Sequence, residues 1–246
     1  MVTIECKNIT FTNIQAVIFD KDGTLIDTSE YLRILAQKRA RLIDAQIPGI
    51  GEPLLMAFGV NGEYLDPAGL MAVGSRYENE IAAAAYIAET GRTWLESIAL
   101  ARRAFAEAEK LLKNTPFPPL SEGCLETLKS LFAAGVKLGI LSADTTARVQ
   151  EFATYYQIEK YLQLLMGVDE GASKPDPALF WQACACLGVE PSTTLMVGDS
   201  AADMEMAKKA GAAGCIGICR GTETAAHLAA ADVAIANLNE IKLLQP

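Results

Sequence analysis

The pattern of hydrophobic and polar positions changes character twice along this chain of 246 residues. Short apolar runs, partly β-branched, dominate the first 25 residues, and helical spacing replaces them from residue 26 to about residue 115. Beyond that point short apolar runs alternate with helical segments, which is typical of βα units on a parallel sheet. The sequence therefore predicts an α/β fold, with a sheet domain formed by residues 1–25 and 116–246 and an inserted helical domain at residues 26–115.

Individual elements follow from the same periodicities. Strands of the sheet are expected at residues 16–19, 136–141, 162–167, 194–197, 215–218 and 233–235. Helices of the insertion are expected at residues 31–45, 53–58, 76–89 and 93–113. Two β-like pieces at residues 2–6 and 9–12 predict a small hairpin or an added edge strand.

Two aspartates come directly after the buried apolar run at residues 16–19. Asp20 and Asp22 are separated by one residue and are followed by Gly23, which permits a sharp turn. In an extended chain their side chains leave on the same side, and two such carboxylates repel unless a cation or a shared proton intervenes. The pattern indicates either a metal site or a nucleophilic carboxylate paired with an acid/base carboxylate.

Polar residues also follow two later strands. Ser142 ends the second, Asp199 ends the third with Asp203 four residues further on, and Lys174 lies in a loop before Pro175. Because parallel strands end along one edge of a sheet, these side chains are expected to converge with Asp20. Carboxylates, a hydroxyl and a lysine in one place suit Mg²⁺-assisted phosphoryl transfer.

Composition excludes several other classes of function. The formal net charge of −9 disfavours a nucleic-acid partner, since phosphate backbones require a basic surface. No apolar run is long enough to cross a membrane, and the first residues lack the pattern of a signal peptide, so a cytoplasmic protein is expected. Six scattered cysteines favour reduced, mostly buried thiols. The segment from Cys215 to Arg220 has four intervening residues where a cysteine-phosphatase loop needs five, so it is interpreted as a core strand.

Four segments in order resemble the motifs of the haloacid dehalogenase-like (HAD) hydrolase superfamily. They are Asp20-Lys21-Asp22-Gly23-Thr24, Leu141-Ser142-Ala143-Asp144, Lys174-Pro175-Asp176-Pro177, and Gly198-Asp199-Ser200-Ala201-Ala202-Asp203. The resemblance covers nearly the whole chain and implies a Rossmann-like core with a helical (C1) cap inserted after the first motif. The cap pattern is similar to that of phosphoglycolate phosphatases.

The resemblance also implies residue roles. Asp20 would attack phosphorus to form an aspartyl-phosphate, and Asp22 would protonate the leaving alcohol and then activate water. Phosphate would be bound by Ser142 and the backbone N–H of Ala143, while Lys174 would steady Asp20 and the phosphoryl oxygens. Mg²⁺ would be held by Asp20, the backbone carbonyl of Asp22, Asp199 and Asp203, and the cap would close over the site.

The carboxylate at Asp22 favours a phosphatase or a phosphomutase over the dehalogenases of the superfamily. The expected function is therefore hydrolysis of a small phosphorylated metabolite, with a β-phosphoglucomutase-like sugar phosphomutase or a non-catalytic HAD-fold binding module as alternatives. Lys21 is expected to point away from the two aspartates and receives no role. Arg76, at the start of a cap helix, is either a substrate contact or a solvated helix-end residue. Monomer and homodimer both remain open.

Overall fold

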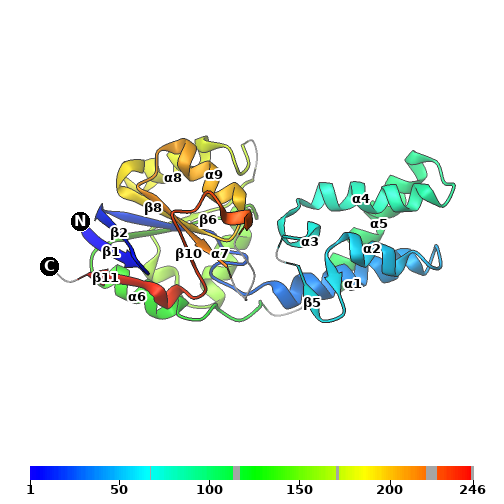
Figure 1. The fold of residues 1–246 in the computed structure, drawn as a ribbon, viewed down its shortest axis with the longest axis horizontal. Coiled ribbons are helices and arrows are strands. Elements are labelled where there is room, and N and C mark those ends of the chain that lie inside the picture. The colour runs from blue at the N-terminus through cyan, green and yellow to red at the C-terminus, as the bar shows by residue number, and fades with distance from the viewer. Residues whose placement is uncertain (67, 113–116, 170–171, 220–225, 245–246) are drawn as a thin grey trace. The chain divides into compact units, whose positions relative to one another are not determined.

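The structure, a computed structural model, describes residues 1–66, 68–112, 117–169, 172–219 and 226–244 (Figure 1). The chain divides into two compact units. The first combines Met1–Asp27 with Pro119–Pro246, and the second is Thr28–Pro118. The sequence placed the first boundary two residues earlier, and its second boundary, between residues 115 and 116, lies outside the described residues.

The first unit is built on a parallel sheet, as predicted. Among the described residues it has six strands in the order β10-β9-β8-β3-β6-β7, and each neighbouring pair runs parallel. The strands are β3 (Ala16–Phe19), β6 (Lys137–Leu141), β7 (Leu164–Met166), β8 (Thr194–Gly198), β9 (Gly214–Ile218) and β10 (Val233–Ile235). The α/β fold class predicted from the alternating pattern is confirmed.

Helices cover both faces of this sheet, which explains why its central strand is apolar throughout. In Figure 1, α8 (Pro177–Leu187) and α9 (Ala201–Ala210) lie on one side of the sheet and α6 (Cys124–Ala133) lies on the other. The fourth helix is α7 (Thr146–Tyr155). All four residues of β3 are buried, so the strand that ends at Asp20 is fixed at the centre of the core.

A second, antiparallel sheet joins the two ends of the chain. Its order is β11-β1-β2, from β1 (Val2–Cys6), β2 (Ile9–Ile14) and β11 (Ile241–Leu244). The predicted hairpin is present, because β1 pairs antiparallel with β2. The pairing of β1 with β11 was not predicted, since it joins segments that lie more than 230 residues apart.

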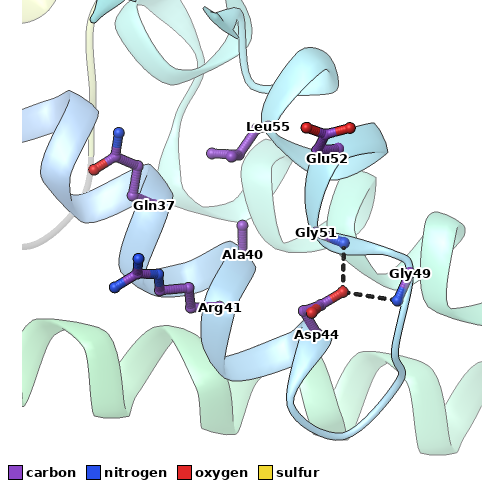
Figure 2. A pocket seen from close by; sticks show the side chains of 8 residues that line it. All are labelled: Gln37, Ala40, Arg41, Asp44, Gly49, Gly51, Glu52 and Leu55. Atoms are coloured by element: carbon purple, nitrogen blue, oxygen red, sulfur yellow. Dashed lines mark hydrogen bonds between the residues drawn. The ribbon is translucent and has the colours of Figure 1, made fainter. Parts of the chain in front are cut away.

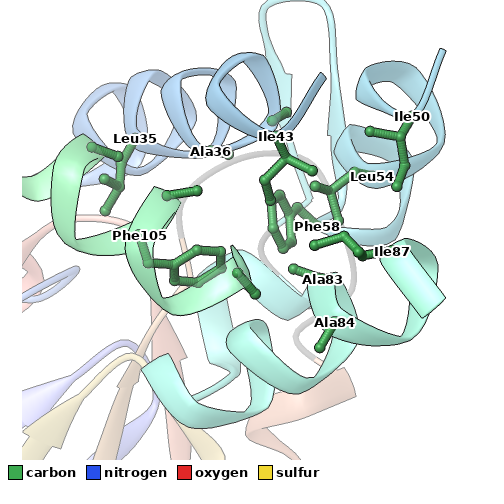
Figure 3. Packing of buried hydrophobic residues seen from close by; sticks show 14 of the residues in the cluster. Leu35, Ala36, Ile43, Ile50, Leu54, Phe58, Ala83, Ala84, Ile87 and Phe105 are labelled. Carbon is green, nitrogen blue, oxygen red and sulfur yellow. The ribbon is translucent and has the colours of Figure 1, made fainter. Parts of the chain in front are cut away.

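The second unit packs its helices around one hydrophobic core, shown in Figure 3. Its elements are α1 (Ser29–Asp44), α2 (Gly51–Ala57), β4 (Val60–Asn61), β5 (Tyr64–Leu65), α3 (Leu70–Val73), α4 (Arg76–Glu89) and α5 (Trp94–Leu112). Phe58 and Phe105 meet edge-to-face at the centre of this core, with ring centroids 6.2 Å apart. The prediction of an all-helical insertion is wrong at residues 60–65, where the Asn61-Gly62 turn closes a short antiparallel pair.

The cysteines follow the interpretation made from the sequence. Cys6, Cys124, Cys184 and Cys215 are buried, and none of the six cysteines, all of which lie in the described ranges, forms a disulfide. Cys215 lies in β9, where burial raises the pKa of its thiol to about 12 and keeps it protonated. Arg220 lies outside the described residues. No helix within the described ranges combines the length and the apolar character required to span a membrane.

Candidate active site

The predicted polar residues follow three neighbouring strands of the parallel sheet. Phe19 at the end of β3 is in register with Ile140 of β6 and Val197 of β8. The next residue, Asp20, donates its N–H to the carbonyl of Val197 at 2.8 Å. Ser142 follows β6 and Asp199 follows β8. The common register therefore brings these residues to one edge of the sheet.

Lys174 joins two of the carboxylates at this edge. Its Nζ lies 2.6 Å from Oδ1 of Asp20 and 2.6 Å from Oδ1 of Asp203. All three side chains are less than a tenth exposed. Burial alone lowers the pKa of Lys174, but the two carboxylates outweigh it and hold that pKa above its usual value. The lysine therefore remains a cation in a dry environment, where unpaired charges are costly.

The start of α9 fixes the position of Asp203. The Ser200 hydroxyl donates to Oδ2 of Asp203 at 2.6 Å, and the Asp203 N–H donates back to Ser200 Oγ at 3.2 Å. This is a capping box, which satisfies N–H groups that a helix start leaves unpaired. The role of Ser200 was not predicted, although the Ser-x-x-Asp spacing before a helix signals it.

Three of the carboxylates could hold a metal ion. Asp20, Asp199 and Asp203 each offer an oxygen within 4.8 Å of the others. Burial, with Asp203 and Asp22 adding to it and Lys174 opposing it, raises the pKa of Asp20 to about 7. Burial, with Asp20 and Asp203 adding to it and Lys174 opposing it, also raises the pKa of Asp199 well above its ordinary value. Crowded carboxylates that disfavour ionisation in the absence of a cation fit a hard divalent ion such as Mg²⁺.

Gly23 is required by two independent features of this edge. Its φ of +77° lies in the left-handed region that favours glycine. A Cβ at this position would also overlap the carboxylate of Asp199. The sequence predicted the turn, and the structure adds a close approach between the first and fourth motif segments.

Ser142 is buried at the start of the loop after β6. Its Oγ accepts the N–H of Asp144 at 3.1 Å, which leaves the hydroxyl proton available to donate to a ligand. Ala143 is exposed beside it, and Thr145 caps the N-terminus of α7. A hydroxyl and backbone N–H groups at a helix start are suited to bind an anion such as phosphate.

Lys21 behaves differently from the expectation. That side chain is only 3% exposed, and its Nζ donates to both carboxylate oxygens of Asp22 at 2.7 Å. The prediction that Lys21 points away from the aspartates is therefore wrong. The backbone turns after β3, so the strict alternation assumed for an extended chain does not apply at this position. The Asp22 side chain is 47% exposed and lies outside the carboxylate group that could hold a metal.

The family model for haloacid dehalogenase-like hydrolases matches residues 14–211 of this chain. The chain belongs to the haloacid dehalogenase-like hydrolases. Similar curated proteins include the probable phosphatase IndB of Dickeya dadantii, at 30% identity over 88% of this chain and 86% of that protein. A phosphoglycolate phosphatase of Pseudomonas putida is 30% identical over 83% of this chain and 69% of that protein.

Solved structures share the fold of this hydrolase. A predicted phosphoglycolate phosphatase from Haemophilus somnus has a TM-score of 0.65 at 21% identity, covering 92% of this chain and 96% of that chain. A putative β-phosphoglucomutase from Thermotoga maritima has a TM-score of 0.60 at 19% identity, covering 90% of this chain and 94% of that chain. The family and the hydrolase class predicted from the four motif segments are confirmed.

Arg76 of the hydrolase has its own partners within the second unit. Its Nε lies 2.9 Å from Glu80, and its Nη1 lies 2.9 Å from Glu109. Glu109 also pairs with the buried Arg39, whose guanidinium lies over the ring of Phe105. Two carboxylates therefore already contact the Arg76 cation, and its role as a substrate contact stays a prediction.

An open pocket of about 490 Å³ lies between α1 and α2 of the second unit (Figure 2). Asp44 on its wall accepts the N–H groups of Gly49 and Gly51, each at 2.9 Å, which orders the loop between the two helices. Its lining residues are Gln37, Ala40, Arg41, Asp44, Gly49, Gly51, Glu52 and Leu55. None of the four motif segments contributes to this lining.

Proposed function

We propose that this hydrolase is a Mg²⁺-dependent phosphatase that cleaves a small phosphomonoester through a phosphorylated Asp20. The observation that carries the proposal is the buried contact of 2.6 Å between Asp20 and Lys174, within the group of carboxylates at the strand ends. A fixed cation beside an attacking carboxylate reduces its repulsion from a phosphoryl group and stabilises charge in the transition state. A structural ion pair alone would not account for two further carboxylates at the same place.

The same residues would hold the metal. Asp20, Asp199 and the backbone carbonyl of Asp22 would supply oxygen ligands, with Asp203 behind them, because its own oxygens already contact Lys174 and Ser200. When bound, Mg²⁺ supplies the positive charge that lets a carboxylate approach a negatively charged phosphoryl group. The raised pKa values of Asp20 and Asp199 support this assignment, since a divalent cation would restore both ionised forms.

The chemistry of the chain's own residues divides into two steps. Oδ1 of Asp20 accepts from Lys174, which leaves Oδ2 to attack phosphorus while the bond from phosphorus to the alcohol oxygen breaks. Asp22 gives its proton to that leaving oxygen. In the second step Asp22 takes a proton from a water molecule as the water attacks phosphorus. The bond to Asp20 then breaks, phosphate leaves, and both aspartates return to their starting states.

Ser142 would orient the phosphate during both steps. Its hydroxyl proton is available because Oγ is already an acceptor for the N–H of Asp144. The backbone N–H of Ala143 would add a second donor. Hydrogen-bond donors placed where charge develops are among the strongest contributions to catalysis of this kind.

The proposed substrate class is a small phosphorylated metabolite in the cytoplasm, with residues 28–118 selecting among such metabolites. Phosphoglycolate and sugar phosphates enter the test panel because relatives and fold neighbours carry those names. A sugar phosphomutase remains the alternative, because Asp20 and Asp22 would serve it equally. It would return the phosphoryl group to a bound sugar phosphate and give interconversion without release of inorganic phosphate.

The test is a phosphate-release screen of small phosphomonoesters with Mg²⁺ and with EDTA, followed by analysis of sugar phosphate products. We expect Mg²⁺-dependent release from one or a few alkyl phosphates. Interconversion of sugar phosphates without release would identify the phosphomutase. A folded protein that does neither would contradict both and support the non-catalytic binding module.

A further inference from the structure

Lys21 is a buried cation that the proposed mechanism does not use. Its side chain is 3% exposed and lies 5.9 Å from the centroid of the Phe152 ring. Transferring an ammonium group out of water is unfavourable unless carboxylates compensate for it. An apolar side chain would fill a buried position without that cost, so packing alone does not explain why a lysine stands at this position.

Two carboxylates from different motif segments compensate for the Lys21 charge. Nζ contacts both oxygens of Asp22 at 2.7 Å and lies 3.4 Å from Oδ2 of Asp144. Asp144 in turn donates its N–H to Oγ of Ser142. The ammonium of Lys21 therefore links the expected proton donor, in the loop after β3, to the expected phosphate-binding hydroxyl, in the loop after β6.

We propose that Lys21 is a positioning residue that fixes the Asp22 carboxyl group for proton transfer at the leaving-group oxygen. This inference rests on the proposed phosphatase function. Asp22 is half-exposed, and the contacts of Lys21 to both of its oxygens define its orientation. A general acid must stand within hydrogen-bond reach of its target, and a displacement of about 1 Å can lower a rate by about 100-fold.

Substrates with different leaving groups distinguish a positioning role of Lys21 from a general effect of the substitution on the fold. As the bond from phosphorus to oxygen breaks, an alkoxide needs the proton of Asp22, whereas p-nitrophenolate leaves without one. The ratio kcat/KM covers the steps through phosphorylation of Asp20. A misplaced Asp22 therefore lowers kcat/KM for alkyl phosphates and spares it for p-nitrophenyl phosphate.

The experiment compares Lys21→Met with the wild type on an aryl ester, p-nitrophenyl phosphate, and on an alkyl ester, phosphoglycolate. If the screen finds another alkyl phosphate that is cleaved faster, that compound takes the place of phosphoglycolate. We expect kcat/KM to fall by about 100-fold for the alkyl ester and to stay within about threefold for the aryl ester. Because Asp22 must also activate water, we expect Lys21→Met to release a burst of p-nitrophenolate that matches the enzyme concentration. Lys21→Arg, which keeps a cation, should recover part of the alkyl phosphatase activity.

Lys137→Met is the matched control, because Lys137 is an exposed lysine at the start of β6, away from the strand ends that carry the motif residues. It should leave both substrates unaffected. If Lys21→Met fails to fold, Asp144→Asn provides the second test, with a smaller loss that is again confined to the alkyl ester. Equal losses on both esters, or no loss on either, would overturn the inference. A wild type that cleaves no phosphomonoester would instead refute the proposed function.

Discussion

Two charge networks, one in each unit, differ in charge balance and in burial. At the strand ends, three carboxylates surround a single lysine: Asp20, Asp199 and Asp203 around Lys174. Three of these four side chains are less than a tenth exposed, and Asp199 is partly buried. With all three carboxylates ionised, negative charge would therefore exceed positive charge by two in a place that water reaches poorly.

The network of the second unit is closer to balance and more open. Three arginines, Arg39, Arg76 and Arg102, contact two glutamates, Glu80 and Glu109. Arg76 and Arg102 are more than half exposed, so solvent screens their charges. Pairs of this kind join α1, α4 and α5 and need no ion from outside.

The contrast shows how a site differs from a structural network built of the same residue types. A surplus of buried like charges persists only where a ligand or metal compensates for it, or where a proton is retained. A screened set of ion pairs makes no such demand. We therefore expect substitutions in the first network to change activity and metal response, and those in the second to change stability modestly.

The largest expected effect is the loss of activity in Asp20→Asn. An amide cannot attack phosphorus, so we expect kcat to fall by about 10⁴-fold or more, the scale seen when a covalent nucleophile is removed. The variant should remain folded, because the raised pKa of Asp20 shows that its ionised form is disfavoured. Steady-state kinetics and circular dichroism would check both expectations, and turnover at the wild-type rate would contradict the mechanism.

Lys174→Met should strongly destabilise the first unit. Removing one partner of a buried ion pair leaves uncompensated charge, which typically costs about 3–5 kcal/mol. Denaturant unfolding in EDTA would measure this loss, with Lys137→Met as the exposed control. Acidification should reduce the loss, because protonated Asp20 no longer needs the cation. An unchanged unfolding midpoint would show that Lys174 does not compensate for the carboxylates.

Asp199→Asn should abolish the thermal response to Mg²⁺. A raised pKa means that the folded state holds a proton that the unfolded chain loses. Without metal, the share of the stability that comes from Asp20 should therefore fall as the pH rises from about 4, the unfolded value, to about 7, the pKa of Asp20.

Mg²⁺ favours the ionised carboxylates, so it should stabilise the wild type more at about pH 8 than at about pH 5. At about 100 times the dissociation constant the gain is about 2.7 kcal/mol, or roughly 5–10 °C in Tm. Thermal melts with Mg²⁺ and with EDTA would measure it. An equal Mg²⁺ response in Asp199→Asn would place the metal elsewhere.

Local pattern was enough to predict the parallel sheet and the residues that follow its strands. Apolar runs with β-branched residues identified β3, β6 and β8, and the shared direction of parallel strands then implied that Asp20, Ser142 and Asp199 meet. The antiparallel strand β11 was missed because its partner lies at the other end of the chain.

The direction of individual charged side chains was harder to predict. Alternation along an extended chain placed Lys21 away from Asp22, but the turn after β3 brings them together. Arg76 contacts Glu109, which lies 33 residues further along the chain. This contact depends on how the helices pack, which periodicity alone does not specify. Such contacts depend on where the backbone carries each side chain, so they become visible only in the folded structure.

The smallest effect is expected for Arg76→Met, which tests whether the charge network of the second unit is purely structural. Exposed ion pairs contribute about 0–1 kcal/mol, so Tm should change by only a few degrees. Because Glu80 and Glu109 already contact the guanidinium, we expect KM and kcat to stay within about twofold of the wild type. Arg102→Met, which removes another exposed contact to Glu80, is the matched control. A rise in KM of about tenfold or more, seen for Arg76→Met and absent from the control, would show that this arginine contacts the substrate and that the second network also belongs to the site.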